Sequence, residues 1–85
     1  MIIHGRVQGV GFRYAAREAA VEIGVSGWVR NLSDGTVEIV AQGTAEALAA
    51  LRSWAAKGPR HAAVERVLVE RCDPRPAAQG FEILR

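Results

Sequence analysis

The stretch Met1–Gly24, MIIHGRVQGVGFRYAAREAAVEIG, decides the fold of this chain. Its first seven residues are rich in isoleucine and valine and favour a strand, and Gly9 and Gly11 then mark a turn. The segment Phe12–Ile23 is dense in Ala, Glu and Arg and has apolar residues at helical spacing, and Gly24 ends it. The stretch therefore predicts a strand, a glycine turn and a helix in succession.

A hairpin and a second helix are predicted next. The segment Val25–Leu32 is rich in β-branched and aromatic residues, an alternating run follows over Val37–Ala41, and Asp34–Gly35 between them is a strong hairpin signal. Thr44 is a good N-cap for an amphipathic helix, which should end at Gly58. Further strands are predicted at 64–72 and, after the Pro74 and Pro76 turn, at 81–84.

This order of elements matches the split βαβ arrangement of ferredoxin-like folds. We therefore expect an α+β domain, with an antiparallel sheet covered on one face by two helices. The chain has no internal repeat and no linker segment, so residues 1–85 should form a single domain.

Composition narrows the classes of function. The apolar share of 49% and the charged share of 24% are those of a globular domain, and no apolar run approaches the roughly 20 residues that span a bilayer. We expect a cytoplasmic protein without membrane partners. Cys72 is the only cysteine, which excludes an internal disulfide, and we interpret it as a small hydrophobic residue. Because His4 and His61 lie far apart, no metal site or other cofactor is expected.

The two predicted helices start differently. Thr44 precedes the second, but no Ser, Thr, Asp or Asn precedes the first, whose first turn carries Arg13 where the helix dipole favours an anion. The glycines of Gln8–Gly11 allow several backbone N–H groups to point inward, and a phosphate would satisfy them. The loop matches neither the P-loop pattern, which needs Gly-Lys followed by Ser or Thr, nor the dinucleotide-binding pattern, which needs a third glycine at Tyr14. A plain glycine turn followed by a solvated arginine stays open as the alternative.

Asn31 is the second candidate site residue. Strands one and two of a βαβ unit run parallel, so Asn31 should lie at the same edge as the glycine loop, roughly 10 Å away across two inter-strand spacings. An amide can orient a water without taking its proton, although Asn31 could instead help to form the hairpin. Arg30 should point to the other face and be solvated. No general acid is placed at this edge of the sheet, so no side chain can protonate the leaving group. The substrate should therefore have a leaving group that departs without a proton, such as the carboxylate of an acyl phosphate.

Two segments resemble the signatures of the acylphosphatase family. The first comprises Gly5 Arg6 Val7 Gln8 Gly9 Val10 Gly11 Phe12 Arg13 Tyr14, and the second comprises Gly27 Trp28 Val29 Arg30 Asn31 followed by Asp34, Gly35 and Val37. Family members usually have several more residues before His4, so strand one starts late in this chain. The resemblance otherwise covers the whole length.

The resemblance implies hydrolysis of a carboxyl-phosphate bond to a carboxylate and inorganic phosphate, without a metal or covalent intermediate. It makes Arg13 and Asn31 the catalytic residues and Gln8, Gly9, Val10, Gly11, Phe12 and Arg13 the phosphate-binding residues. The expected partner is a small acyl phosphate, with phosphate or sulfate as competing anions, and we expect a monomer that binds no nucleic acid. Two alternatives are a binding module on the same fold, which recognises phosphorylated ligands or RNA, and an accessory domain like those of hydrogenase maturation proteins.

Overall fold

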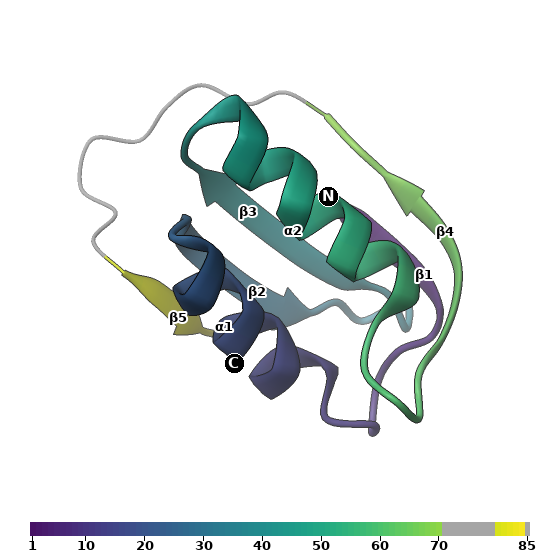
Figure 1. Ribbon diagram of the computed structural model, residues 1–85. Coiled ribbons are helices and arrows are strands. Elements are labelled where there is room, and N and C mark those ends of the chain that lie inside the picture. Colours follow the sequence, from purple (N-terminus) through teal and green to yellow (C-terminus); the bar gives the residue numbers. More distant parts are fainter. Residues whose placement is uncertain (71–79, 85) are drawn as a thin grey trace.

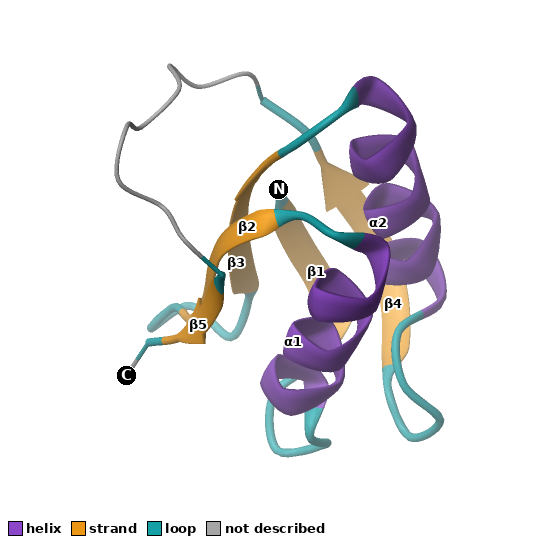
Figure 2. Cartoon of the chain, turned by 60° about the vertical axis from the view of Figure 1, so that its left-hand side comes forward, coloured by secondary structure: helices purple, strands orange, loops and turns teal. Residues whose placement is uncertain are grey.

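The computed structural model describes residues 1–70 and 80–84. Its elements follow one another as strand, helix, strand, strand, helix, strand, strand. Their bounds are β1 Ile2–Arg6, α1 Phe12–Ile23, β2 Ser26–Asn31, β3 Val37–Gln42, α2 Ala45–Lys57, β4 Ala63–Leu68 and β5 Phe81–Ile83. Both helices lie on one face of the sheet, so the chain forms two layers (Figures 1 and 2). The predicted ferredoxin-like α+β architecture is confirmed.

The sheet has the strand order β4-β1-β3-β2-β5. β1 pairs antiparallel with β3 and β4, and β2 pairs antiparallel with β3, so β1 and β2 run in the same direction as predicted. The sheet is not antiparallel throughout, because β5 pairs parallel with β2 through Gly27 and Phe81. β4 and β5 therefore lie at opposite edges of the sheet and run in opposite directions.

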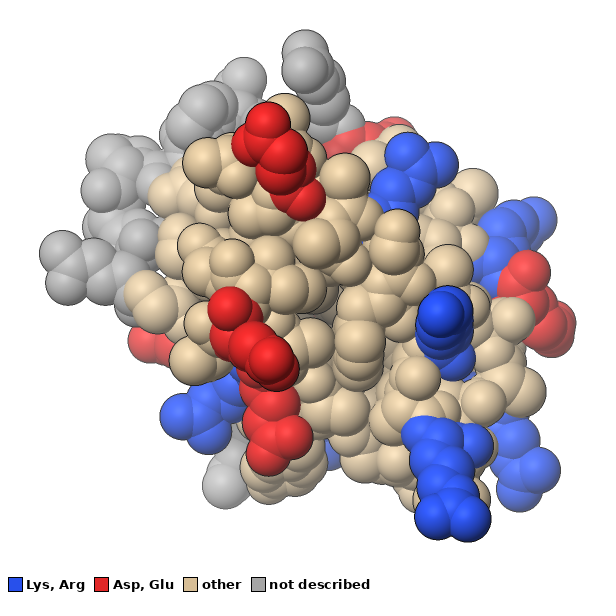
Figure 3. Space-filling model, in the orientation of Figure 1, with Lys and Arg blue, Asp and Glu red and all other residues tan. Residues whose placement is uncertain are grey.

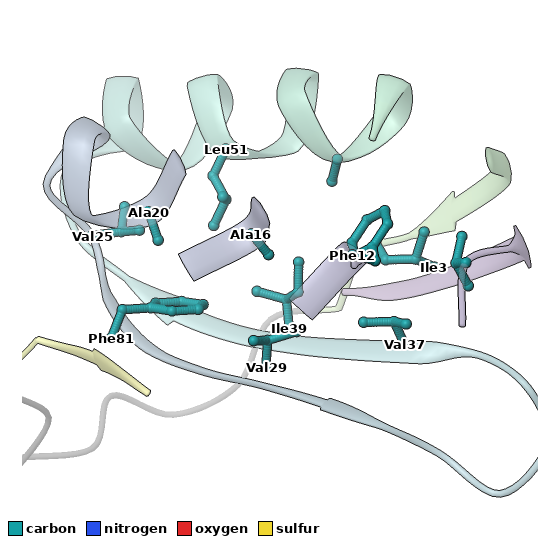
Figure 4. Packing of buried hydrophobic residues seen from close by; sticks show 12 residues of the cluster. Ile3, Phe12, Ala16, Ala20, Val25, Val29, Val37, Ile39, Leu51 and Phe81 are labelled. Atoms are coloured by element: carbon teal, nitrogen blue, oxygen red, sulfur yellow. The ribbon is translucent and has the colours of Figure 1, made fainter. Parts of the chain in front are cut away.

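The core lies between the helices and the sheet. Figure 4 shows Phe12 and Leu51 directed from the two helices toward Ile3 and Ile39 on the central strands. All four side chains are buried, and the Phe12 ring also lies 5.3 Å from the ring of Trp54, between centroids. Phe12 is the first residue of α1, so its burial fixes the start of that helix against the sheet and α2.

The helix bounds follow the predicted signals. α1 covers Phe12–Ile23 and ends at Gly24, whose φ of 96° is left-handed and whose N–H donates to the carbonyl of Ala20. α2 ends at Gly58, as expected. Among the described residues, no helix is long and apolar enough to cross a membrane.

The strand bounds differ more from prediction. β4 ends at Leu68, whereas the sequence favoured a strand to Cys72, and Cys72 lies outside the described residues together with the turn at Pro74 and Pro76. β1 is paired from its beginning, because the backbone N–H of Ile39 donates to the carbonyl of Met1 at 2.9 Å.

Candidate active site

The β1–α1 loop, residues 7–11, presents open backbone donors. Gly9 and Gly11 have φ values of 74° and 76°, in the left-handed region that favours glycine. Within residues 1–70 and 80–84, no backbone carbonyl accepts a hydrogen bond from the N–H groups of residues 9–14, and the first such bond runs from Ala15 to Gly11. The loop and the first turn of α1 therefore offer a run of N–H groups to an external acceptor.

Arg13 lies at the start of α1, beside these donors. The N-cap is Gly11, no side chain caps the helix, and its first turn contains no acidic residue. Among the described residues, the ion pair that forms is between Arg30 and Glu38, so Arg13 has no carboxylate partner there. An anion at this helix end would meet the guanidinium, the positive end of the dipole and the N–H groups together.

Asn31 is the last residue of β2 and lies on the helix-covered face. Its register partner is Val37, which is fully buried, and directly paired residues share a face of the sheet. Ile3 on β1 is the other register partner of Val37, so Asn31 and Ile3 stand roughly 10 Å apart, at two strand spacings. β1 continues past this level and leads into the loop.

Arg30 points to the opposite face, as predicted, but it is not simply solvated. Its Nε donates to Oε1 of Glu38 at 2.8 Å, and its guanidinium lies 5.0 Å from the centroid of the Trp28 ring. These contacts hold Arg30 on the open face of the sheet, away from Asn31.

The Gln8 side chain connects the loop to the β2–β3 turn. Its Nε2 donates to the carbonyl oxygens of Leu32 at 2.8 Å and Thr36 at 2.9 Å. The sequence predicted only that Gln8 contributes to the anion-binding loop, and it gave no signal for this contact, because the two carbonyls come from a turn more than twenty residues away. The loop and the end of β2 are thus fixed to each other.

Asp34 and Thr36 order that turn. Oδ1 of Asp34 accepts from the backbone N–H of Thr36 at 3.0 Å and from its hydroxyl at 2.6 Å. The hydroxyl bond and then the backbone bond lower the pKa of Asp34. Thr36 is buried, so its polar groups depend on these bonds. The predicted Asp34–Gly35 hairpin signal works here through the Asp34 side chain.

Four basic residues belong to the elements that meet at the end of the molecule that holds the loop. The β1–α1 loop and the α2–β4 connection are neighbours there, and a Cβ atom on Gly58 would lie 2.9 Å from Cε2 of Phe12 (Figure 2). Arg6, Arg13, Lys57 and Arg60 belong to the elements that meet at this end. Figure 3 shows Lys and Arg side chains along the right-hand side from top to bottom and also at the lower left, and Asp and Glu mainly at the top and left of centre. The sequence placed its basic residues along the whole chain, and folding brings these four to one end.

The donors at this end are the backbone N–H groups, the Arg13 guanidinium and the Asn31 amide. In the described part of the chain, no three side chains of His, Cys, Asp or Glu gather closely enough to hold a metal ion. Glu18 and Glu22, the acidic residues nearest to the β1–α1 loop in sequence, are exposed and lie further along α1. The arrangement can bind an anion and orient a neutral molecule beside it.

The chain is similar to known proteins in both sequence and fold. The family model for acylphosphatase matches residues 1–83. The chain belongs to the acylphosphatase family. A curated acylphosphatase from Roseiflexus sp. (strain RS-1) is 51% identical over 84 residues, covering 99% of this chain and 90% of that relative. Acylphosphatase is a hydrolase activity, and relatives with this name share about half of their residues with the chain.

Two solved structures have the same fold as this chain. The crystal structure of acylphosphatase from Bacillus subtilis superposes with a TM-score of 0.93 and 36% identity, over 99% of this chain and 93% of that one. A crystal structure of full-length HypF, in its phosphate- and nucleotide-bound form, gives a TM-score of 0.87 and 27% identity, over 98% of this chain and 11% of that one. This fold thus makes up most of the Bacillus subtilis acylphosphatase chain and a small part of the HypF chain.

Proposed function

We propose that this chain hydrolyses acyl phosphates to a carboxylate and inorganic phosphate, with Arg13 and the Gln8–Arg13 loop holding the phosphoryl group and Asn31 positioning the water. One observation carries the proposal. The N–H groups of residues 9–14 have no backbone acceptor in the described chain, and this run includes Arg13, whose guanidinium has no carboxylate partner there. A phosphoryl group supplies the acceptors that this helix start lacks.

The phosphoryl group would be bound by charge and by fixed donors. The backbone N–H groups and the Arg13 guanidinium would meet the phosphoryl oxygens, where they stabilise the charge of the transition state. Gln8 contributes through the backbone of the loop, because its side-chain N–H groups already bind Leu32 and Thr36. Phe12 supplies an N–H while its ring stays in the core.

The attacking group would be a water beside Asn31. The amide of Asn31 accepts from the water and donates to a phosphoryl oxygen, which aims the water at phosphorus. The bond from water oxygen to phosphorus forms as the bond from phosphorus to the acyl oxygen breaks, and that oxygen leaves with the electron pair as a carboxylate. A proton of the water passes to the phosphate product, so no side chain has to act as a general acid.

The test is the hydrolysis of benzoyl phosphate in the presence of EDTA. We expect the native chain to be active, and Arg13→Ala and Asn31→Ala to lose nearly all activity while keeping the native circular dichroism spectrum. Arg30→Ala is the matched control for Asn31, since Arg30 is its neighbour on the opposite face. Retained activity in folded Asn31→Ala would remove its role, and an inactive native chain that still binds phosphate would be a binding module.

The remaining expectations belong to the same proposal. Residues 1–85 would act as one domain, as a monomer in the cytoplasm, with phosphate and sulfate as competitive inhibitors and no nucleic-acid or membrane partner. The position of Arg30 over Trp28 on the open sheet face argues against the stacking surface that RNA-binding domains of this fold need. Size-exclusion chromatography, cell fractionation and inhibition kinetics test these points separately.

A further inference from the structure

The Gln8 side chain makes two hydrogen bonds that the chemistry of the site does not require. A carboxamide NH₂ has two donors, and both are used, on the carbonyl oxygens of Leu32 at 2.8 Å and Thr36 at 2.9 Å. Leu32 directly follows Asn31 in the chain, and Thr36 directly precedes Val37, the register partner of Asn31. Gln8 therefore connects the loop to both chain segments that leave the Asn31–Val37 pair.

The two acceptors are held in place by the turn itself. The carbonyl of Leu32 also accepts from the N–H of Gly35 at 3.2 Å, and the carbonyl of Thr36 also accepts from the N–H of Leu32 at 2.9 Å. Each carbonyl thus receives one bond from the turn and one from Gln8. Behind them, Oδ1 of Asp34 accepts from both the N–H and the hydroxyl of the buried Thr36. The β2–β3 turn therefore has its own hydrogen bonds, which hold the two carbonyl groups in place for Gln8.

On the basis of the proposed function, we propose that Gln8 is a positioning residue, which sets the distance between the phosphate-binding loop and Asn31 and is supported from behind by Thr36 and Asp34. The loop would hold the phosphoryl group and Asn31 the water, and the Gln8 hydrogen bonds link the two. The alignment of the water with the phosphorus atom determines the rate of attack. Loss of the connection would leave the loop's own N–H groups able to grip phosphate, but would misplace the phosphoryl group relative to the water. The effect should fall on kcat rather than on phosphate affinity.

The first variant is Gln8→Met, which keeps the length of the side chain and removes both donors. With benzoyl phosphate we expect kcat to fall about tenfold to 100-fold, while the inhibition constant of inorganic phosphate changes less than about twofold. If the inhibition constant rises in parallel with the loss of kcat, Gln8 is a direct phosphate ligand and the proposal is wrong. An unchanged kcat in a folded variant overturns it as well.

The second variant, Gln8→Glu, supplies a readout that a merely structural role would not move. An ionised carboxylate cannot donate to the two carbonyls, but a protonated one can donate a single bond. The activity of Gln8→Glu relative to native should therefore rise as the pH is lowered toward about 5, approaching the ordinary carboxyl range. Gln8→Met should show no such recovery. Equal pH profiles for the two variants would contradict the positioning role.

Thr36→Val tests the support from the β2–β3 turn without changing the β1–α1 loop. This test can be made even if the Gln8 variants fail to fold. It removes the hydroxyl bond to Asp34 and leaves the Thr36 backbone N–H and carbonyl in place. We expect a fall in kcat of about twofold to tenfold with phosphate inhibition unchanged. An unchanged kcat would overturn the supporting role of Thr36. Failure of the proposed function is distinguishable, because the native chain itself would then be inactive on benzoyl phosphate.

Discussion

The two helices of this domain begin in opposite ways. At α2, Oγ1 of Thr44 accepts from the N–H of Ala47 at 3.1 Å, Glu46 lies in the first turn and Lys57 in the last, so charge and capping all match the helix dipole. At α1, the N-cap is Gly11 with φ 76°, no side chain caps it, and the first turn carries Arg13. The N-terminus of α2 is capped by its own side chain, whereas the backbone N–H groups at the N-terminus of α1 have no such acceptor. In the proposed function, this difference distinguishes the helix end that binds the phosphoryl group from the one that does not.

Removing the cation from α1 should give the largest effect. We expect Arg13→Ala to lower kcat/KM about 100-fold to 1,000-fold, as when one fixed donor to a transition-state anion is removed. The same change should leave the free energy of unfolding unchanged or raise it by about 0.3–1 kcal/mol, because a cation near a helix N-terminus opposes the dipole. Activity assays and urea unfolding measure the two effects.

Arg17→Ala is the control for this experiment, since Arg17 is exposed and lies one turn further along the same helix. It removes the same charge outside the first turn. A similar loss of activity in both variants would mean that overall charge, and not the start of α1, is responsible.

An anion should stabilise the domain through α1 alone. Inorganic phosphate at about 100 times its dissociation constant should add about 2.7 kcal/mol to the free energy of unfolding, because it binds only the folded chain. Thr44→Ala should show the same stabilisation, and Arg13→Ala should show little. Thermal unfolding with and without phosphate measures the difference, and an unaffected native chain would count against the anion site.

The complementary change at α2 should affect stability alone. Thr44→Ala removes the acceptor for the N–H of Ala47 and should cost about 1 kcal/mol. Thr44→Ser keeps the acceptor and should restore most of that loss. Hydrolysis of benzoyl phosphate should be unchanged in both variants, and a marked fall in kcat with Thr44→Ala would break the contrast between the two helix starts.

The smallest effect concerns Asp34 in the turn that supports the site. Its bonds to Thr36 lower its pKa in the folded state, so the ionised carboxylate adds stability above its unfolded pKa of about 3.9. That contribution is lost as the pH falls through the lower, folded pKa. In Asp34→Asn the difference in stability from native should therefore be largest near neutral pH and shrink below about pH 4. A difference that is constant with pH would contradict the role of the charge.

Much of this fold could be predicted because its signals are local. Glycines end both helices, Thr44 caps α2, and the periodicity of α1 gave its bounds from Phe12 to Ile23. The parallel pairing of β5 with β2 could not be predicted, since a short segment such as Phe81–Ile83 carries no information about its neighbour or direction. The end of β4 was also placed too late, because strand propensity continues beyond Leu68.

The candidate site was predictable to the extent that its parts belong to the backbone. The missing cap and the glycines at 9 and 11 are visible in the sequence, and their open N–H groups follow from helix geometry. The bonds of the Gln8 side chain and the ion pair of Arg30 were not visible, since each joins segments whose distance depends on the final register. The roles of Arg13 and Asn31 in the reaction remain predictions.

The basic end of the molecule has a practical consequence. We expect Arg6, Arg13, Lys57 and Arg60 to favour binding of this end to a flat polyanionic surface, such as a sulfonated resin or a citrate-coated gold particle. Immobilised in this way, the enzyme would be held with the β1–α1 loop against the support. Attachment through another face would leave this loop facing the solution, so the charge of the support should affect the activity of the immobilised protein.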